Sequence, residues 1–364
     1  MMTHYEERLE QDLKTIRSRV KEVAARVGKA LKDAVQAVIN GDRVLANSVI
    51  LGDLPINREI REIDRLTHAF VARHLPSAGH LRYVSPVLRL NIELERIGDY
   101  AVAIAREAIQ LAAPPTGSVL RDIELIGDQS HRIFTQAMKA FDEGNADLAR
   151  GTKGMAGQVN STFQRILSDL HHEGEKQTRP IKDLFALLVI INRLGRVSDQ
   201  AKNICEETVF AATGETKGEK TYPILFIDEK NDSLSLMAEL HARKIFPESG
   251  QYSSAGWSPA SHLDPRFELC MDSHGYDLRD LEPQLLDASV ESLNEYFAVV
   301  SLQAGAHEHI RELPFHTLLL EWDVGEIPDG LDQERNEALL EEAHKRVSLE
   351  VQELMETLRG QKAR

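Results

Sequence analysis

Two pairs of oxygen-bearing side chains in the first third of the chain have the spacing of a metal site. Asp53 and Asn57 are four residues apart, and so are Glu95 and Asp99. In a helix, residues four apart lie on the same face. Two carboxylates on one face repel each other unless a cation or water lies between them. If the two helices face each other, four oxygen ligands could converge on a hard cation or on iron.

The same residues have a purely structural interpretation that the sequence leaves open. Glu95 could pair with Arg89 or Arg96 on a solvated helix face. Asp199, further along the chain, could pair likewise with the arginines three and six positions before it. Exposed helix pairs of this kind contribute only about 0.3–0.5 kcal/mol of stability. They would therefore not demand these residue types.

Long helices are expected to position these groups. From residue 9 to residue 27 the apolar side chains are spaced 4-3-4-3-4, which places them along one ridge of a helix. This helix is expected to end at Asn40-Gly41, a common helix terminator. Three long helices with short connections indicate an antiparallel bundle. The second and third helices are expected at residues 42–74, with a candidate kink at Pro55, and at residues 80–113.

The pattern of the first three helices then repeats. Residues 41–46 (Gly-Asp-Arg-Val-Leu-Ala) are echoed 103 positions later by Gly-Asn-Ala-Asp-Leu-Ala. Residues 96–101 (Arg-Ile-Gly-Asp-Tyr-Ala) are echoed 100 positions later by Arg-Val-Ser-Asp-Gln-Ala. Amphipathic helices resemble one another by chance, but agreement in a loop and a helix interior at nearly one offset favours duplication. We predict two tandem three-helix bundles, at residues 5–113 and 117–213.

The last third of the chain has a different pattern. Residues 213–221 are polar and lack apolar periodicity, which is typical of a linker. Apolar runs and helical patterns then alternate, which indicates a small parallel-sheet α/β domain at residues 222–360. The predicted fold class is therefore multidomain, α plus α/β. The expected strands are residues 222–227, 251–255, 297–302 and 317–322, and the expected helices are residues 233–244 and 331–358.

Composition limits the function classes. The formal net charge of −15 argues against a nucleic-acid binder and against direct adhesion to anionic lipid. The two cysteines, Cys205 and Cys270, form no disulfide framework and indicate a reducing, cytoplasmic compartment. Cys270 is expected to lie in a core, and His307 and His309 on a solvated loop. No apolar leader and no run of about 18 apolar residues is visible, so membrane contact would go through a protein partner.

The helical part resembles a known family. Residues 94–99 (Leu-Glu-Arg-Ile-Gly-Asp) and 194–199 (Leu-Gly-Arg-Val-Ser-Asp) resemble the Glu-Arg-Ile-Gly-Asp-His-Ala signature of the PhoU family. The turn at residues 76–82 and the acidic segment at residues 53–64 are also similar, and the resemblance covers residues 5–213. It implies a cytoplasmic regulator of inorganic phosphate transport and phosphate-starvation signalling, peripheral to the inner membrane through its partners. The implied partners are the ATPase subunit of a phosphate ABC transporter and a membrane sensor histidine kinase.

The resemblance also implies a homodimer and a divalent metal or iron on Asp53, Asn57, Glu95 and Asp99. The second bundle departs from the pattern, because Gly195 stands at the Glu position and about Ala156 at that of Asp53. Of the four ligand positions, Asn160 and Asp199 remain there. We therefore expect a metal site in the first bundle, and a weak site or none around Asp199.

Residues 224–239 resemble the active-site segment of low-molecular-weight protein tyrosine phosphatases and arsenate reductases, and residues 252–257 resemble their second strand. That chemistry needs a low-pKa thiolate within a loop of backbone N–H groups, and an arginine that clamps the phosphoryl oxygens. Asp228 stands at the cysteine position and Leu234 at the arginine position, so the resemblance implies a degenerate, non-catalytic domain. The remaining matched positions are the loop-bracing Asn231, Ser233 at the helix start, and Glu326 near the general acid.

Alternatives stay open at this point. The loop could bind a cation through Asp228, Glu229 and Asp232, or Asp228 could be a nucleophile, which would need bound Mg²⁺. For the whole protein, the alternatives to a regulator are a phosphatase or arsenate reductase and a metal-storing helical bundle.

Overall fold

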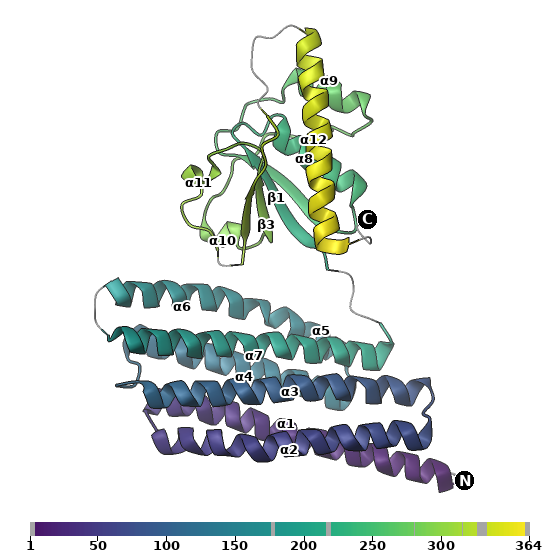
Figure 1. Cartoon of the computed structure of the whole chain (residues 1–364), viewed down its shortest axis with the longest axis vertical. Helices are drawn as coiled ribbons and strands as arrows, with labels where there is room; N and C mark the ends of the chain where they lie inside the picture. The colour runs from purple at the N-terminus through teal and green to yellow at the C-terminus, as the bar shows by residue number, and fades with distance from the viewer. Residues whose placement is uncertain are drawn as a thin grey trace. The chain divides into compact units, whose positions relative to one another are not determined.

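The computed structural model contains two compact units, Met1–Lys217 and Gly218–Arg364, which we call the helical unit and the sheet unit. It describes residues 4–175, 179–215, 220–279, 281–314, 316–325 and 333–360 (Figure 1). The predicted combination of α-helical bundles with a parallel-sheet α/β domain is confirmed. Within these ranges, no helix has the length and apolarity needed to cross a bilayer.

The first half of the helical unit contains three long helices, α1 (His4–Asn40), α2 (Arg43–His74) and α3 (Ala78–Gln110). The predicted apolar ridge of α1 is buried along its length, because it faces α2, α3 and the following helix, α4 (Gly117–Glu143). Gly41, at φ +64°, lets the chain turn after α1. The Asp42 side chain then accepts the backbone N–H groups of Val44 and Leu45 and starts α2.

The second half repeats this plan with one difference. Its helices are α4 (Gly117–Glu143), α5 (Ala146–Met155), α6 (Gly157–Glu175) and α7 (Ile181–Thr213). The turn between α4 and α5 again uses a glycine at positive φ, Gly144, and then an Asx cap, Asn145, which explains the repeated sequence at this loop. The middle helix of this half is divided at Ala156 into α5 and α6, an interruption that the sequence did not predict. The corresponding α2 is one continuous element and runs through Pro55.

The two halves meet along α3 and α7, which pack against each other in the centre of the helical unit. Polar contacts connect them, among them those from Arg89 to Glu207, from Asn203 to Glu93 and from Arg96 to Gln200. The residue numbers rise along α3 as they fall along α7, so the two helices are antiparallel. Equivalent helices of the two repeats therefore face each other as a two-fold rotation would place them, which supports the inferred duplication.

The sheet unit has four parallel strands in the order β2-β1-β3-β4. Side chains alternate between its faces, so Ile224 and Phe226 belong to one apolar core while Leu225 and Ile227 belong to another. The first core is completed by α8, α9 and α12, and the second by α10 and α11. The strands are β1 (Tyr222–Asp228), β2 (Gly250–Gly256), β3 (Ala298–Ser301) and β4 (Leu318–Glu321). The helices are α8 (Leu234–Ile245), α9 (Pro265–Ser273), α10 (Val290–Leu293), α11 (Ala306–His309) and α12 (Gln333–Arg359).

Candidate functional site

The predicted acidic site of the first bundle lies where α2 crosses α3. Asp53 and Asn57 lie on one face of α2, and the Asn57 side-chain amide donates to Asp53 Oδ2 at 2.7 Å. On α3, Gly98 lies directly opposite, and a Cβ atom at that position would be only 3.3 Å from Asp53 Oδ1. Glycine at position 98 thus lets the carboxylate of Asp53 approach the α3 backbone between Glu95 and Asp99.

The electrostatics of this site favour a positive ligand. Burial, and then the negative charges of Asp99 and Glu95, raise the pKa of Asp53 above its ordinary value. The side-chain oxygens Asp53 Oδ1 and Asn57 Oδ1 are buried and lack a hydrogen-bond partner. Glu95 and Asp99 are exposed, so they border the site from the solvent side. Two unsatisfied oxygens, beside the carboxylates of Glu95 and Asp99, form a donor set that suits a hard, oxygen-preferring cation.

The three carboxylates do not converge on one point in this structure. In the described part of the chain, three acidic, histidine or cysteine ligand atoms lie within 4.8 Å of one another only at Cys270, His274 and Glu341. Glu95 and Asp99 are exposed, and such side chains can change rotamer at little cost. A cation held by Asp53 and Asn57 could therefore draw them in.

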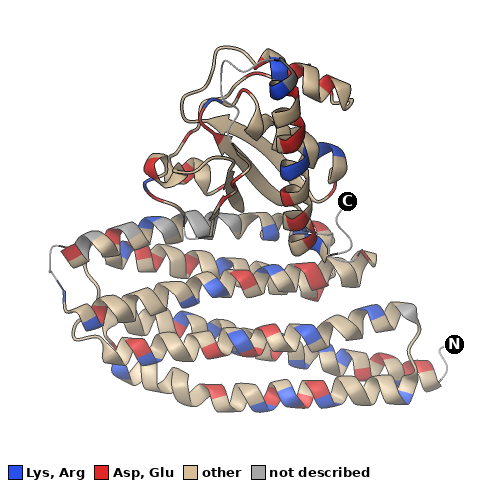
Figure 2. Ribbon diagram, turned by 45° about the horizontal axis from the view of Figure 1, so that its top comes forward, with Lys and Arg blue, Asp and Glu red and all other residues tan. Residues whose placement is uncertain are grey.

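The alternative that these carboxylates form ordinary ion pairs with nearby arginines differs between the bundles. The two arginines expected for Glu95 contact other residues, whereas Asp199 pairs with Arg196. Arg89 pairs instead with Glu207 at 2.8 Å, and Arg96 lies 3.7 Å from Glu93. Asp199 lies 3.3 Å from Arg196 and 3.8 Å from Lys202, so cations of the protein itself already balance its charge. Figure 2 shows acidic and basic residues interspersed along the helices of the helical unit, a distribution in which such local pairs are expected.

The second bundle differs from the first in its middle helix and at two of the four ligand positions. Ala156, at the position equivalent to Asp53, is the point at which the middle helix breaks into α5 and α6. Gly195, at the Glu95 position, contributes no ligand, and the nearest atom to a Cβ there would belong to Phe163 at 3.9 Å. The side chain of Asn160 lies outside the described residues. The expectation of a weak site or none around Asp199 stays a prediction.

The phosphatase-like loop connects β1 to α8 at the carboxyl end of the parallel strands, the usual ligand position in such sheets. Asp228 is only 2% exposed and points into this loop. Its Oδ1 accepts the backbone N–H of Asn231 at 2.5 Å, and its Oδ2 accepts that of Ser235 at 2.8 Å. Burial raises the pKa of Asp228, although these two hydrogen bonds oppose the effect. The carboxylate thus takes the backbone donors that a bound anion would otherwise need.

The remaining residues brace the loop. Asn231 is fully buried at φ +49°, donates to Ser235 Oγ at 2.8 Å and accepts the backbone N–H of Gln284 at 2.7 Å. Gly256 is required beside it, because a Cβ there would lie 2.7 Å from the carbonyl oxygen of Glu229. Leu234 is buried in the core.

The cation alternative for this loop gains no support in the described residues. Asp228 faces inward, while Glu229 is exposed and its backbone N–H binds the Gln303 side chain at 2.9 Å. Asp232 accepts a hydrogen bond from Ser233 Oγ at 3.1 Å, and burial raises its pKa. Glu326, the position matched to the general acid, lies outside the described residues.

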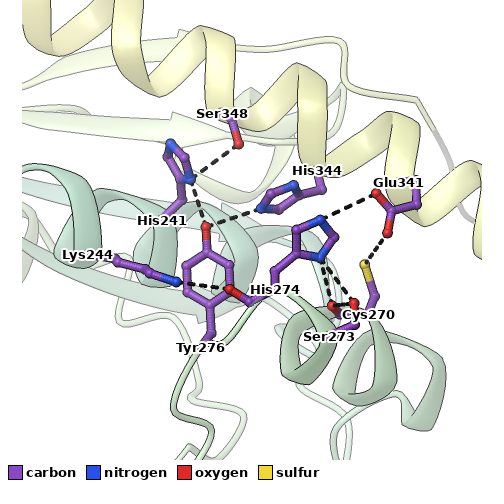
Figure 3. A network of polar contacts seen from close by, with 9 residues as sticks. All are labelled: His241, Lys244, Cys270, Ser273, His274, Tyr276, Glu341, His344 and Ser348. Atoms are coloured by element: carbon purple, nitrogen blue, oxygen red, sulfur yellow. Dashed lines mark hydrogen bonds and ion pairs between the residues drawn. The ribbon is translucent and has the colours of Figure 1, made fainter.

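Sequence reasoning missed one cluster in the sheet unit. Cys270, expected in the core, is half-buried and faces Glu341 of α12 across 4.0 Å. His274 Nε2 lies 3.4 Å from the same carboxylate (Figure 3). The sequence contains two short motifs of metal-ligand type, Cys-x₃-His at residues 270–274 and Glu-x₂-His at residues 341–344. Nothing in the sequence indicates that the two motifs lie close together in the fold. The His307 and His309 side chains lie elsewhere, near Glu321 and stacked on Trp257 respectively.

Two family models match the chain. The PhoU domain matches twice, at residues 20–108 and 123–208, and the low molecular weight phosphotyrosine protein phosphatase family matches residues 223–364. A PhoU homologue of Pseudomonas putida, a phosphate-specific transport system accessory protein, is 32% identical over 58% of this chain and 83% of its own length. The corresponding Escherichia coli protein is 27% identical over 58% of this chain and 88% of its own. The crystal structure of PhoU from Pseudomonas aeruginosa superposes with a TM-score of 0.54 at 31% identity, covering 57% of this chain and 99% of that one.

Asp53→Asn tests whether the acidic site needs a cation. Because the folded-state pKa of Asp53 is raised, ionisation destabilises the fold as the pH rises above about 4, the ordinary Asp value. In chelator-treated protein at pH 7, we expect Asp53→Asn to raise the melting temperature of the helical unit, and to lose this advantage near pH 4. When metal is added, the increase in melting temperature that the metal causes should be smaller in Asp53→Asn than in the wild type.

The matched control is Asp199→Asn, which removes a carboxylate that Arg196 and Lys202 already balance. Melting curves of the full chain should show no stabilisation for this variant at pH 7. Equal stabilisation by both variants would contradict the site.

Asp228→Ala tests the structural role of the buried carboxylate. It leaves the backbone N–H groups of Asn231 and Ser235 without an acceptor, which costs about 1–3 kcal/mol for each buried group. We expect hydrogen exchange measured by mass spectrometry to accelerate in peptides covering residues 228–240. Asp232→Ala, which loses only a side-chain contact, should change exchange far less. Unchanged protection in Asp228→Ala would show that the carboxylate does not hold the loop.

Proposed function

The chain belongs to the PhoU family, and we propose that it is a non-catalytic accessory and regulatory protein of a phosphate transport system. The observation that carries the proposal is the agreement of the whole helical unit with PhoU relatives over 83% of the length of one of them. That relative is named as an accessory protein of phosphate-specific transport. The acidic site on α2 and α3 lies within the first matched PhoU domain, residues 20–108.

We further propose that this protein works by docking, with the ATPase subunit of a phosphate ABC transporter and a membrane sensor histidine kinase as partners. One observation that supports docking is an apolar row at the start of α7. Ile181, Phe185 and Leu188 follow one another at helical spacing and are 72%, 64% and 37% exposed. Exposed apolar rows of this kind suit a partner helix or groove. A homodimer is a second use that such a surface allows.

A divalent metal or iron on Asp53, Asn57, Glu95 and Asp99 is part of the proposal. Asp53 and Asn57 offer buried, unsatisfied oxygens, and Glu95 and Asp99 would complete the donor set from α3. A bound cation would supply positive charge to a site that now has a surplus of negative charge. It would thereby join α2 to α3, which makes the ion a structural or signalling component. A metal-storing bundle is less well supported, because the second repeat lacks equivalent ligands.

For the sheet unit we propose a non-catalytic role, although its family model is that of a phosphatase. Asp228 occupies the loop and engages two of its backbone donors, and Leu234 is buried in the apolar core. Neither side chain supplies a thiolate nucleophile or a guanidinium clamp. The proposed location of the whole protein is the cytoplasm, at the membrane only through its partners.

The docking proposal predicts a specific co-purification. An affinity-tagged full chain, expressed in its own cells with ample phosphate, should bring down the ATPase subunit of a phosphate transporter. Phe185→Ser should reduce the recovery, because it removes an apolar side chain that is 64% exposed. Leu349→Ser, which alters a 52% exposed leucine on α12, is the matched control and should not. Failure of the wild-type chain to recover any transporter subunit would contradict the proposal.

The non-catalytic proposal predicts that the purified full chain does not hydrolyse an aryl phosphate or reduce arsenate in the presence of thiols. Turnover that is lost in Asp228→Asn would establish the enzyme alternative instead, with Asp228 as nucleophile. Asn has one acceptor oxygen for the two backbone N–H groups that Asp228 binds, so hydrogen exchange of residues 228–240 must be measured on the same variant to separate lost chemistry from a loosened loop. Assays with and without Mg²⁺ are needed, because phosphoryl transfer to an aspartate requires a cation.

A further inference from the structure

Two helices of the sheet unit bring together side chains that no part of the proposed function uses. Cys270 lies on α9. His274 is four residues further along the chain and directly follows the last residue of that helix. Glu341 lies on α12, the helix that packs against α9. Figure 3 shows Cys270 and His274 directed toward the Glu341 carboxylate from the other side of this helix contact.

The ligand-type atoms of these residues are close together. Glu341 Oε1 lies 4.0 Å from Cys270 Sγ, and Glu341 Oε2 lies 3.4 Å from His274 Nε2. One ligand atom from each of the three residues lies within 4.8 Å of the other two. In tetrahedral zinc sites, bond lengths of about 2.0–2.3 Å place neighbouring ligand atoms about 3.4–3.7 Å apart. The ligand atoms of the cluster therefore lie at most about 1.4 Å further apart than they would around a single zinc ion.

The orientation of the imidazole is a second, independent observation. His274 Nδ1 lies 2.9 Å from the backbone carbonyl oxygen of Cys270, to which it donates. This hydrogen bond fixes the ring and leaves Nε2 as the atom that faces Glu341. Metal-binding histidines are held in this way, with one ring nitrogen on a carbonyl and the other on the metal.

A network of polar and aromatic contacts lies next to the cluster. The His344 ring lies against His274, with centroids 4.3 Å apart, and its Nε2 contacts the Tyr276 hydroxyl at 3.2 Å. The same hydroxyl lies 2.9 Å from His241 Nδ1, and Lys244 Nζ lies 4.1 Å from the centre of the Tyr276 ring. These contacts keep His344 beside the cluster. His344 lies on α12, three residues after Glu341.

We propose that Cys270, His274 and Glu341 form a binding site for a borderline-soft divalent transition metal, with Zn²⁺ as the metal best suited to this donor set. A thiolate and an imidazole favour Zn²⁺ or Co²⁺ over Mg²⁺ and Ca²⁺, which prefer oxygen ligands. The site is distinct from the oxygen-only site proposed on α2 and α3. Its existence does not depend on the proposed function.

The surroundings leave room for a fourth, exchangeable ligand. Cys270 and Glu341 both line a cavity of ≈ 640 Å³ between α9 and the start of α12. Three protein ligands with an open fourth position distinguish exchangeable zinc sites from closed structural ones. Water or a small anionic ligand from this cavity could complete the coordination. The metal would also cross-link α9 to α12.

The test uses the purified full chain after treatment with a chelator, titrated with Co²⁺. We expect a thiolate-to-cobalt charge-transfer absorption band whose intensity at saturation corresponds to one thiolate-bound Co²⁺ per chain. Excess Zn²⁺ should remove the band, whereas excess Mg²⁺ should leave it. The band identifies a cysteine ligand, so Co²⁺ bound at the oxygen-only site of the helical unit does not produce it.

Variants assign the band to the cluster. Cys270→Ser should abolish the band. Glu341→Gln and His274→Gln should weaken Co²⁺ binding by at least about tenfold, because even residues that only hydrogen-bond to a metal ligand change metal affinity by that factor. Cys205→Ser is the matched control, because Cys205 is the other cysteine of the chain and is buried in α7. Glu341 is exposed, so its substitution leaves the fold intact.

The competing interpretation is a simple ion pair between protonated His274 and Glu341, without a metal. In that case wild-type protein shows no charge-transfer band, and the proposal is overturned. A band that persists in Cys270→Ser, or that disappears in Cys205→Ser, overturns it equally. A band lost only with the cluster residues supports it.

Discussion

A carboxylate that is withdrawn from water must find a positive charge or hydrogen-bond donors, and the two units of this protein meet this requirement in opposite ways. Asp53 retains a buried oxygen without a partner and is repelled by Asp99 and Glu95. Asp228 is more deeply buried, yet backbone N–H groups satisfy both of its oxygens. The first arrangement is incomplete without a ligand, and the second is complete by itself. This difference is why we place ligand binding in the helical unit and a structural role at the phosphatase-like loop.

The duplication supports this interpretation, because the acidic positions of one bundle can be compared with the equivalent positions of the other. The equivalent helices α3 and α7 are antiparallel and share polar contacts such as Arg96 to Gln200. Asp99 of the first bundle adds its negative charge to Asp53, whereas Asp199 of the second is neutralised by Arg196 and Lys202. The second bundle has also lost the continuous middle helix, at Ala156. The first repeat thus has a partly buried carboxylate beside like charges, and the corresponding carboxylate of the second repeat is paired with cations of the protein.

Local signals predicted most of the fold. The Asn40-Gly41 terminator and the apolar runs of the parallel strands act over a few residues, so the sequence shows them directly. The break at Ala156 was not predicted, although Gly154 and Gly157 on either side weaken the helix there.

Long-range contacts were harder to foresee. The capture of backbone donors by Asp228 depends on the path of the loop, which Gly256 makes possible from a neighbouring strand. The Cys270, His274 and Glu341 cluster joins positions about 70 residues apart through the packing of α9 on α12. No pattern within either segment contains that information.

The most direct test of the account is the expression of phosphate-starvation genes in cells that lack this chain. With ample phosphate, we predict that a reporter of those genes is switched on by the deletion and switched off again by the full chain. The double variant Asp53→Asn, Asp99→Asn should fail to restore repression, while Asp199→Asn should restore it. A reporter that stays off in the deletion strain, or full repression by the double variant, would contradict the central claim that a regulator acts through its acidic site.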